Sequence, residues 1–302
     1  MRVTLIHNPT AGDESHSRSE LCATLADAGH DVRYHSINAD GWAEALHVPT
    51  DLVAVAGGDG TVRRVVKELA GSDVPLTLLP VGTANNIART LGFGDAAIVE
   101  LVRAWPRART WPFDVGKVDA TSGETHFVEA VGGGLFADLL ARAEEADDDA
   151  NDPDEDLERG LRLLLDAIAE ARTRRWTLEL DGTDVSDDLL AVEALNVGES
   201  GPRIPLAPGA DPSDGQLEVV LVRPDAAGSL AAHVEARLKQ RAPEPPRLEV
   251  LRGRSLRIEF PDGCPVRVDD RLWGGEGESV VVSVGDVRVD VLVPYLGTAS
   301  SL

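Results

Sequence analysis

Short apolar segments alternate with amphipathic segments over the first 105 residues of the chain. The apolar segments have the length of strands and lie at residues 3–6, 32–37, 52–56 and 76–79. The amphipathic segments carry apolar residues three and four positions apart, as helices do, and lie at residues 19–28, 42–46, 62–69, 87–91 and 96–105. Strands that alternate with helices are typical of a parallel sheet with crossover helices, so the pattern predicts an open α/β domain.

The helix expected at residues 62–69 has the clearest end signals. Its apolar face repeats at i, i+3, i+4 and i+7 from Val62. Thr61 is expected as its N-cap, because a hydroxyl can accept a backbone N–H there, and Gly71 follows the end of the helix.

After Pro106 the pattern changes to hairpins. Strands are expected at residues 114–119, 126–131, 176–180, 189–197, 216–222, 248–260, 266–269, 280–284 and 287–293, and helices only at 157–172 and 226–241. This change predicts an α/β domain over residues 1–113 and a β-rich domain over residues 114–285. Residues 286–302 could rejoin the first domain.

The chain is strongly acidic, with 52 Asp and Glu against 29 Lys and Arg and a net charge of −23. This charge argues against a nucleic-acid partner, because proteins that bind the phosphate backbone carry basic surfaces. Only Lys67, Lys117 and Lys239 are lysines. An acidic composition with arginine in place of lysine predicts adaptation to high intracellular salt, where the screening length falls to about 3 Å at 1 M.

Other features of the sequence predict a cytoplasmic protein. No segment approaches the roughly 18 apolar residues of a membrane-spanning helix, and the first apolar run meets Pro9 too early for a signal peptide. Cys22 and Cys264 show neither a disulfide framework nor a metal-ligand spacing. Residues 144–158 hold ten carboxylates around Pro153 and are expected to form a solvated loop.

Three loops that follow expected strands carry small and polar residues, at 8–12, 57–61 and 82–86. Loops at the carboxyl ends of strands in an open α/β sheet converge on one crevice. Gly57, Gly58 and Gly60 allow close backbone approach, and N–H groups at a helix start favour a phosphate. A carboxylate beside a phosphate needs a cation between them, so Asp59 indicates a nucleotide with Mg²⁺. Ordinary turn chemistry would explain the glycines but not Asp59.

Longer motifs around these loops carry a family resemblance. They are Asn8-Pro9-Thr10-Ala11-Gly12, Gly57-Gly58-Asp59-Gly60-Thr61 and the segment 80–89, followed by the glycine-rich segment 127–138 and by Ala210-Asp211-Pro212-Ser213-Asp214-Gly215-Gln216-Leu217. Together they resemble the catalytic domain of the diacylglycerol kinase family, which includes bacterial lipid kinases and sphingosine and ceramide kinases. The family is related in fold to NAD kinases.

The resemblance implies an ATP- and Mg²⁺-dependent kinase acting on a lipid hydroxyl. Its expected fold is an NAD-kinase-like α/β nucleotide-binding domain with an open sheet, followed by a β-sandwich-like C-terminal substrate domain. The residues expected to line the nucleotide pocket are Asn8, Thr10, Gly57, Gly58, Gly60, Thr61, Gly82, Thr83 and Asn85. Asp59 is expected to act in catalysis and at the metal, and Asp114 matches an acidic position near the metal.

The resemblance also implies a general base, the Glu of an Asp-Gly-Glu sequence on a late strand. Asp269, Asp270 and Arg271 stand there in this chain, and a guanidinium cannot accept a substrate proton. Three alternatives follow: Asp269 or Asp270 takes the role, Glu276 reaches in from the next turn, or catalysis is impaired. The third loop likewise has Asn86 where many members have Asp.

The expected partners are a lipid substrate and, transiently, a membrane surface. Arg172, Arg174 and Arg175 could contact that surface, although a solvated helix end that interacts favourably with the helix dipole is the simpler explanation of them. An edge strand of the β-rich domain could be buried in a homodimer. The alternatives to a lipid kinase are an NAD kinase-like enzyme and a nucleotide- or lipid-binding protein that has lost catalysis.

Overall fold

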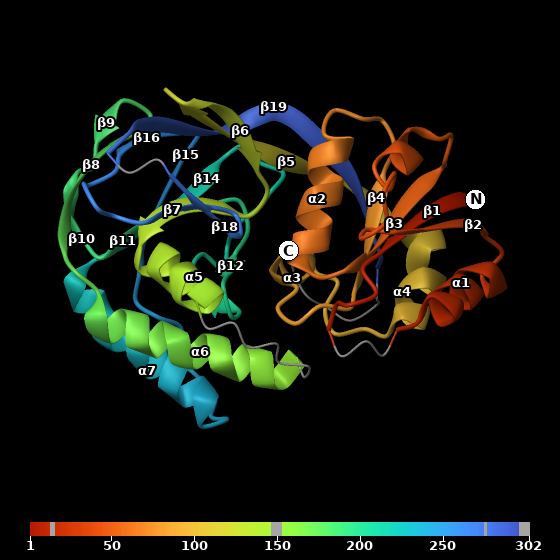
Figure 1. The fold of residues 1–302 in the computed structure, drawn as a ribbon, viewed down its shortest axis with the longest axis horizontal. Coiled ribbons are helices and arrows are strands. Elements are labelled where there is room, and N and C mark those ends of the chain that lie inside the picture. The colour runs from red at the N-terminus through yellow and green to blue at the C-terminus, as the bar shows by residue number, and fades with distance from the viewer. Residues whose placement is uncertain (13–15, 146–152, 275–276, 296–302) are drawn as a thin grey trace. The chain divides into compact units, whose positions relative to one another are not determined.

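The computed structural model describes residues 1–12, 16–145, 153–274 and 277–295. The chain divides into two compact units (Figure 1). Unit 1 comprises Met1–Phe113 and Val287–Leu302, and unit 2 comprises Asp114–Asp286. Each unit is described by itself below.

Unit 1 is built on a parallel sheet in the order β4-β3-β1-β2. Its strands are β1 (Arg2–His7), β2 (Asp31–Ser36), β3 (Leu52–Gly57) and β4 (Leu76–Pro80). Its helices are α1 (Arg18–Asp27), α2 (Asp59–Leu69), α3 (Asn86–Thr90) and α4 (Ile98–Ala104), with 3₁₀ turns η1 (Glu44–His47) and η2 (Trp105–Arg107). Figure 1 shows α2 on one face of the sheet and α1 and α4 on the other. The predicted α/β organisation is therefore confirmed.

Helices on both faces explain why β3 is apolar at every position. Its residues from Leu52 to Ala56 are at most 1% exposed, as expected for a strand covered on both sides. The predicted N-cap of α2 is wrong. The helix begins at Asp59 with Gly58 as its N-cap, because the Gly58 carbonyl already accepts N–H bonds from Thr61 and Val62 at 3.0 and 3.1 Å.

Unit 2 is a sandwich of two antiparallel sheets with helices on its outer side. One sheet has six strands in the order β15-β14-β11-β7-β17-β18. These strands are β7 (Ala130–Gly134), β11 (Ala191–Leu195), β14 (Leu217–Val222), β15 (Glu249–Gly253), β17 (Val266–Val268) and β18 (Arg271–Trp273). The facing strands are β5 (Arg109–Ala120), β6 (Gly123–Phe127), β8 (Arg174–Leu180), β9 (Thr183–Asp184), β10 (Asp187–Leu189), β16 (Ser255–Glu259) and β19 (Ser279–Val293). Strands β12 (Glu199–Ser200) and β13 (Ile204–Pro205) form a separate hairpin.

Two apolar cores lie on the two faces of the six-stranded sheet. Val219 and Leu221 of β14 pack in the core that contains Trp176 and Ile258 of the facing sheet. Val220 and Val222 alternate with them and pack in a second core, under α5 (Leu135–Glu145), α6 (Pro153–Glu170) and α7 (Ala227–Leu238). A strand buried on both faces needs apolar side chains at nearly every position. The expected β-sandwich-like domain is confirmed, with a layer of helices added.

Several predicted boundaries in unit 2 are wrong. Residues 248–260 form β15 and β16, which lie in different sheets, and residues 126–131 are divided between β6 and β7. Residues 280–284 and 287–293 belong to the single strand β19. Helix α5 was not predicted. The expected acidic loop is helical at Glu144 and Glu145 and again from Pro153, and its middle lies outside the described residues.

Candidate functional site

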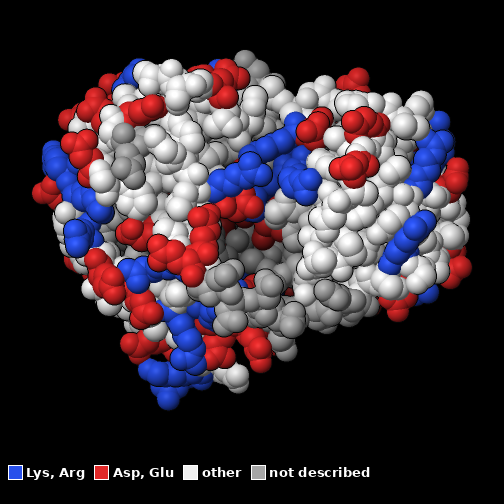
Figure 2. Space-filling model, viewed as in Figure 1, with Lys and Arg blue, Asp and Glu red and all other residues white. Residues whose placement is uncertain are grey.

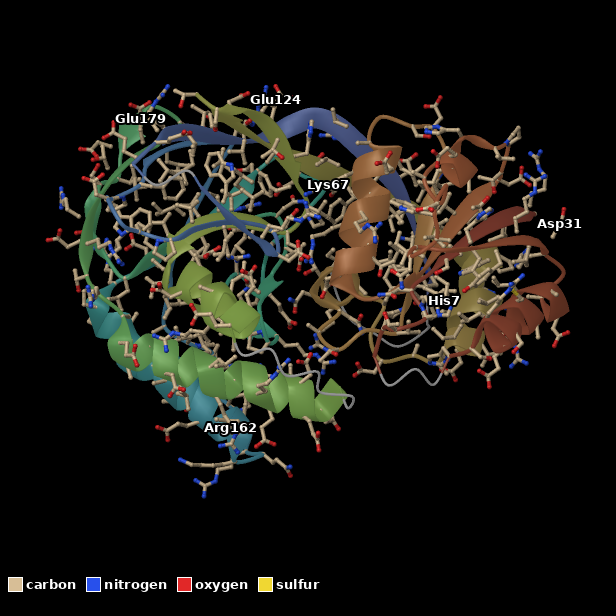
Figure 3. The ribbon with its side chains drawn as sticks, viewed as in Figure 1. His7, Asp31, Lys67, Glu124, Arg162 and Glu179 are labelled. Atoms are coloured by element: carbon tan, nitrogen blue, oxygen red, sulfur yellow. The ribbon has the colours of Figure 1, made fainter. Side chains whose placement is uncertain are left out.

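The three predicted loops of unit 1 meet at the carboxyl edge of its sheet. His7 ends β1 and Asp31 begins the neighbouring strand β2, and Figure 3 shows them at opposite ends of these parallel strands. The Asn8 N–H donates to the Ala56 carbonyl at 2.9 Å, and the Val81 N–H donates to the Gly57 carbonyl at 3.2 Å. These bonds tie the first and third loops to the second.

Contacts between backbones require glycine in these loops. A Cβ on Gly82 would lie 2.3 Å from the Gly58 Cα, and a Cβ on Gly58 would lie 3.2 Å from the Gly82 Cα. Gly12 has a φ of +66°, and a Cβ there would lie 2.1 Å from the Val81 carbonyl oxygen. A side chain on Gly57 would overlap the Thr61 side chain. The structure therefore brings all three loops into contact.

Asp59 connects the second loop to the third. It is the first residue of α2, and its Oδ2 and Oδ1 accept the backbone N–H groups of Asn86 and Ile87, both at 2.9 Å. The carboxylate therefore caps the start of α3, where N–H groups lack helical partners. Burial raises the pKa of Asp59, while the two N–H bonds and the nearby Arg63 guanidinium oppose that rise.

Asn85 fixes the loop before α3. It lies in the left-handed region with a φ of 55°, and its side-chain Nδ2 donates to the Gly82 carbonyl at 2.6 Å. Its Oδ1 accepts the Gly82 N–H at 3.2 Å. The side chain of Asn85, which was predicted to line the nucleotide pocket, thus fixes the conformation of its own loop. Thr83 lies in the same loop and is half-buried.

Asn8 organises the first loop. Its Oδ1 accepts the backbone N–H of Thr10 at 3.2 Å and the Thr10 hydroxyl at 2.9 Å. The Asn38 Nδ2, just after β2, approaches the same oxygen at 3.4 Å. A hollow of about 350 Å³ lies next to Asn38 and is lined by residues 37–44 and Arg64. The Arg64 guanidinium lies over the Trp42 ring, 4.9 Å from its centroid.

Asp114, the predicted acidic position of unit 2, is 1% exposed. Its Oδ2 accepts the Gly215 N–H at 2.8 Å and its own N–H donates to the Pro212 carbonyl at 2.7 Å. The Asn196 Nδ2 donates to the backbone carbonyl of Asp114 at 2.8 Å. Asp114 thus joins the motif at residues 210–217 to β5.

Asp269 is a buried structural carboxylate in this geometry. It is 3% exposed, with a φ of 55°. Its Oδ1 accepts backbone N–H groups from Val128, Glu129 and Ala130 at 3.0, 2.8 and 3.4 Å. Asp270 and Arg271 follow on the surface, and Arg271 begins β18. Glu276, the third alternative for the proton acceptor, lies outside the described residues.

A buried ion pair that the sequence reasoning missed supports this turn. Arg267 Nη2 lies 2.7 Å from Glu193 Oε2, with the two side chains 9% and 0% exposed. Arg267 Nη1 also donates to the Asp269 carbonyl at 2.8 Å. Both residues face Gly132 across β7, where a Cβ would lie 2.4 Å from the Glu193 Cδ. One charged residue inside each of two apolar strand patterns was the only signal in the sequence.

The described part of the chain offers few side chains that could hold a metal ion together. Among residues 1–12, 16–145, 153–274 and 277–295, no group of three or more His, Cys, Asp or Glu side chains is placed to hold a metal ion. A magnesium ion at Asp59 would therefore take most of its ligands from phosphate oxygens and water, as Mg²⁺ often does. Asp59 fits that arrangement, because a carboxylate oxygen that accepts one N–H keeps a further lone pair.

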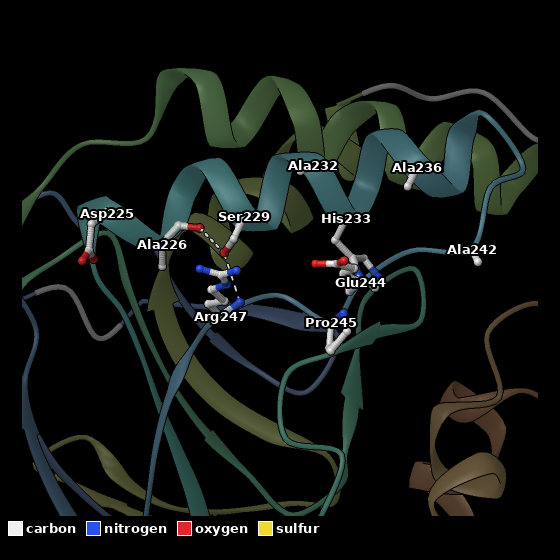
Figure 4. A pocket seen from close by; sticks show the side chains of 10 residues that line it. All are labelled: Asp225, Ala226, Ser229, Ala232, His233, Ala236, Ala242, Glu244, Pro245 and Arg247. Atoms are coloured by element: carbon white, nitrogen blue, oxygen red, sulfur yellow. Dashed lines mark hydrogen bonds between the residues drawn. The ribbon is translucent and has the colours of Figure 1, made fainter.

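A second hollow, in unit 2, is lined by none of the predicted site residues. It has a volume of about 680 Å³ and lies between α7 and residues 242–247 (Figure 4). There the Ser229 hydroxyl donates to the Ala226 carbonyl at 2.9 Å and accepts the Arg247 N–H at 3.0 Å. The buried His233 Nδ1 lies 2.7 Å from the Glu244 carbonyl oxygen. These contacts hold the segment after α7 against the helix.

The surface reflects the acidic composition. Carboxylates are scattered over the face seen in Figure 2, with basic side chains between them. No helix that the structure describes is long and apolar enough to cross a membrane.

Family models match both parts of the chain. The diacylglycerol kinase catalytic domain matches residues 2–118, and the YegS C-terminal NAD kinase beta sandwich-like domain matches residues 137–291. A diacylglycerol kinase of Mycobacterium tuberculosis is 26% identical over 281 residues, which cover 86% of this chain and 85% of that protein. A diacylglycerol kinase of Bacillus subtilis is 26% identical over 241 residues, or 74% of each chain.

Solved structures show the same fold. A diacylglycerol kinase structure from Bacillus anthracis covers 97% of this chain and 96% of its own, with a TM-score of 0.67 and 20% identity. Yeast NADH kinase covers 98% of this chain and 84% of its own, with a TM-score of 0.52 and 10% identity. The sequence resemblance and the predicted fold class are both confirmed.

Proposed function

Because this chain belongs to the diacylglycerol kinase family, we propose that it uses ATP and Mg²⁺ to phosphorylate a hydroxyl of a diacylglycerol-like lipid. Unit 1 would bind the nucleotide and unit 2 the lipid. The observation that carries the proposal is the junction at Asp59. There the Asp59 carboxylate connects the loop at 57–61 to the loop at 82–86, through its bonds to the N–H groups of Asn86 and Ile87. Gly58 and Gly82 lie in close contact, and helix α2 begins at the same point.

The phosphates would be bound mainly by backbone groups. The first N–H groups of α2, at Asp59 and Gly60, have no intrahelical acceptor. Together with the helix dipole they favour an anion. The Gly58–Gly82 contact sets where these N–H groups point, so binding would depend on the loops more than on any side chain. Asn8, Thr10 and Asn85 would hold the loops in shape rather than contact the phosphates directly.

Asp59 would hold the metal with the phosphates. Bound Mg²⁺ would neutralise charge on the transferred phosphoryl group. Asp59 must be ionised to bind the metal, and burial, which raises its pKa, works against ionisation. The two N–H donors from α3 reduce that cost. Asp59 would therefore have two roles, since it also keeps the third loop in register with the second.

The hollow beside Asn38 suits the nucleoside part of ATP. Strands β3, β1 and β2 are neighbours, and adjacent strands lie about 4.8 Å apart. The end of β2 is therefore roughly 10 Å from the Gly58 loop, about the length of a nucleoside monophosphate. Arg64 stacked on Trp42 would present a planar cation beside the base.

Asp270 is the proton acceptor that we propose for the lipid hydroxyl. Asp269 has its Oδ1 occupied by three N–H donors and is buried, which suits it to position the turn. Asp270 is the next carboxylate and is exposed. Because general base catalysis depends first on reach, a neighbouring carboxylate can replace an expected Glu. Loss of catalysis with retained nucleotide binding is the competing proposal.

The Asp59→Asn variant tests the proposed function. We expect it to fold, because Asn keeps one of the two acceptor oxygens, and to lose at least about a hundredfold in ATP-dependent transfer to diacylglycerol. Asp51→Asn is the matched control. It removes the same charge from an exposed carboxylate that pairs with Arg2 and precedes β3.

Three results would sink or redirect the proposal. Equal turnover of the Asp59→Asn and wild-type proteins would remove Asp59 from the reaction. Nucleotide binding by calorimetry, without transfer to any of a panel of lipids at high salt, would favour a binding protein. Formation of NADP from NAD and ATP would favour the NAD kinase alternative, for which the likeness to yeast NADH kinase shows only the fold.

A further inference from the structure

Three arginines of unit 2 surround a hollow that is separate from the site described above. The hollow has a volume of about 380 Å³ and is lined by Asp138, Arg142, Ala167, Glu170, Arg172 and Arg174. These residues come from α5, from the end of α6, from the connection after α6 and from the start of β8. Helices α5 and α6 pack side by side (Figure 1). The hollow belongs entirely to unit 2.

The charges of this hollow are only partly balanced. Arg142 is paired with Glu170 at 2.6 Å. Arg174 donates to the Gly263 carbonyl at 3.3 Å. Arg172 is exposed and has no hydrogen-bond or ion-pair partner in the part of the chain that the structure describes. Three guanidinium groups and two carboxylates line the hollow, and a third carboxylate, Asp166, attracts Arg142 from nearby.

Arg172 and Arg174 are close in the sequence, and both line the hollow. Arg172 lies in the connection between α6 and β8, and Arg174 is the first residue of β8. Arg175 projects on the other side and lies 3.8 Å from Asp188 of β10. It does not line the hollow.

We propose that this hollow binds the phosphate of an anionic phospholipid headgroup and so docks the protein on a membrane surface. Planar guanidinium groups match phosphate oxygens in pairs, and Arg172 supplies a guanidinium that forms no close ion pair with a described residue. The larger hollow under α7 offers a contrast, because its lining has Asp225 and Glu244 against Arg247 and would repel an anion.

The half-buried Asp138 lies among the three arginines. Burial raises the pKa of Asp138, against the attraction of Arg174, Arg142 and Arg172. The proposal deepens the proposed function, since a lipid kinase must meet its acceptor at a membrane. Headgroup binding is nevertheless measurable without ATP or acceptor, so the two can fail separately.

Cosedimentation with vesicles tests the proposal. The vesicles contain phosphatidylcholine alone or mixed with phosphatidylglycerol. We expect the wild-type protein to partition preferentially to the mixed vesicles, and Arg172→Gln to reduce that preference about fivefold, since one basic residue near an anionic surface contributes about 1 kcal/mol. Arg172→Gln/Arg174→Gln should reduce it further. Arg175→Gln is the matched control and should stay within about twofold of wild type.

Equal losses for Arg172→Gln and Arg175→Gln would overturn the proposal, because they would show a diffuse charge effect. Absence of any preference for phosphatidylglycerol would overturn it as well. A thermal-shift measurement with inorganic phosphate distinguishes binding of a phospholipid headgroup from binding of free phosphate. Stabilisation of the wild type but not of Arg172→Gln at phosphate concentrations that also release the protein from vesicles would assign the hollow to free phosphate instead. Turnover of a short-chain, water-soluble diacylglycerol should be the same for Arg172→Gln and wild type.

Discussion

Replacing Gly82 by alanine tests whether the contact between the two glycine loops controls nucleotide binding. Gly82 has no left-handed φ, so alanine brings no backbone strain of its own. The added Cβ would lie 2.3 Å from the Gly58 Cα and 2.9 Å from the Gly58 nitrogen. Both neighbours are backbone atoms and cannot rotate away. Restoring an ordinary contact of 3.4 Å requires the loops to separate by about 1.1 Å.

A displacement of this size should affect binding more than folding. Overpacking costs typically about 1–3 kcal/mol of the free energy of unfolding. A misplacement of about 1 Å in a preorganised site can cost on the order of a hundredfold in rate. We therefore expect Gly82→Ala to fold and to bind ATP at least about tenfold more weakly, as measured by titration calorimetry, with unfolding followed by circular dichroism.

Two further glycines provide a graded control. In Gly58→Ala the new Cβ would lie 3.2 Å from the Gly82 Cα, so its effect should be smaller than that of Gly82→Ala. Gly228 lies in α7 with nothing within 4 Å of its added Cβ, and alanine there should stabilise the helix by about 0.5–1 kcal/mol without changing ATP affinity. If Gly82→Ala binds ATP within twofold of wild type, the loop contact does not set the phosphate site and the reasoning fails.

Three other predictions concern carboxylates. Asp269→Asn should lower the free energy of unfolding by about 1–3 kcal/mol, because a neutral amide oxygen accepts the three buried N–H groups more weakly than a carboxylate does. Asp270→Asn should leave the melting temperature unchanged and lower kcat by about 10²–10⁴; the reverse pattern contradicts the assigned roles. Arg267→Met should lower the free energy of unfolding, measured in urea, by about 3–5 kcal/mol, because it leaves Glu193 buried and unpaired. Adding Glu193→Gln should recover part of this loss. Equal stability of the single and double variants would show that Arg267 and Glu193 are not coupled. Because Asp59 must ionise and its pKa is raised, the acid limb of kcat/KM should lie above the ordinary Asp value of about 3.9. The favourable effect of Asp59 on stability is present below that value and is lost as pH rises through the raised folded-state pKa. Asp59→Asn should therefore gain stability relative to wild type as pH rises above about 4, and an unchanged difference in urea unfolding would contradict this.

Local patterns predicted the α/β part of the fold well. The alternation of apolar runs with helical periods identified β1, β3 and β4 and the helices between them, because each signal lies within a few residues of sequence. The start of α2 was misplaced for a local reason. Gly58 has the extended conformation of an N-cap without a capping side chain, and the side chain of Thr61 instead packs within the first turn beside Gly57.

The missed features of unit 2 depend on distant parts of the chain. Helix α5 follows three glycines of β7 without a turn, so its start carries no local signal. Strands β15 and β16 are separated by Arg254 alone, and only their partners, β14 and β8, show that they belong to different sheets. The hydrogen bonds that the Asp269 side chain accepts come from N–H groups about 140 residues away along the chain.

The sequence predicted which loops form the candidate site, but not which hydrogen bonds connect them. The position of 57–61 and 82–86 after expected strands indicated that these loops would lie close together, and they do. The sequence did not show that Asp59 caps α3, or that Asn8 and Asn85 use their side chains on their own loops. Residue types report which chemistry is available, whereas hydrogen-bond partners depend on the assembled fold.

Strand β19 has a consequence for how the protein is made. Its residues 279–283 pair with β16 in unit 2, while Val291 pairs with Leu76 of β4 in unit 1. The buried Thr77 hydroxyl donates to the Leu292 carbonyl at 2.8 Å, across 215 residues of sequence. During synthesis, β4 therefore remains an open sheet edge until the ribosome has passed residue 292, although unit 1 begins first. Contacts this distant form slowly, and an exposed edge invites association with other chains. A fragment that stops at Phe113 would keep that edge open permanently and should aggregate where the whole chain does not.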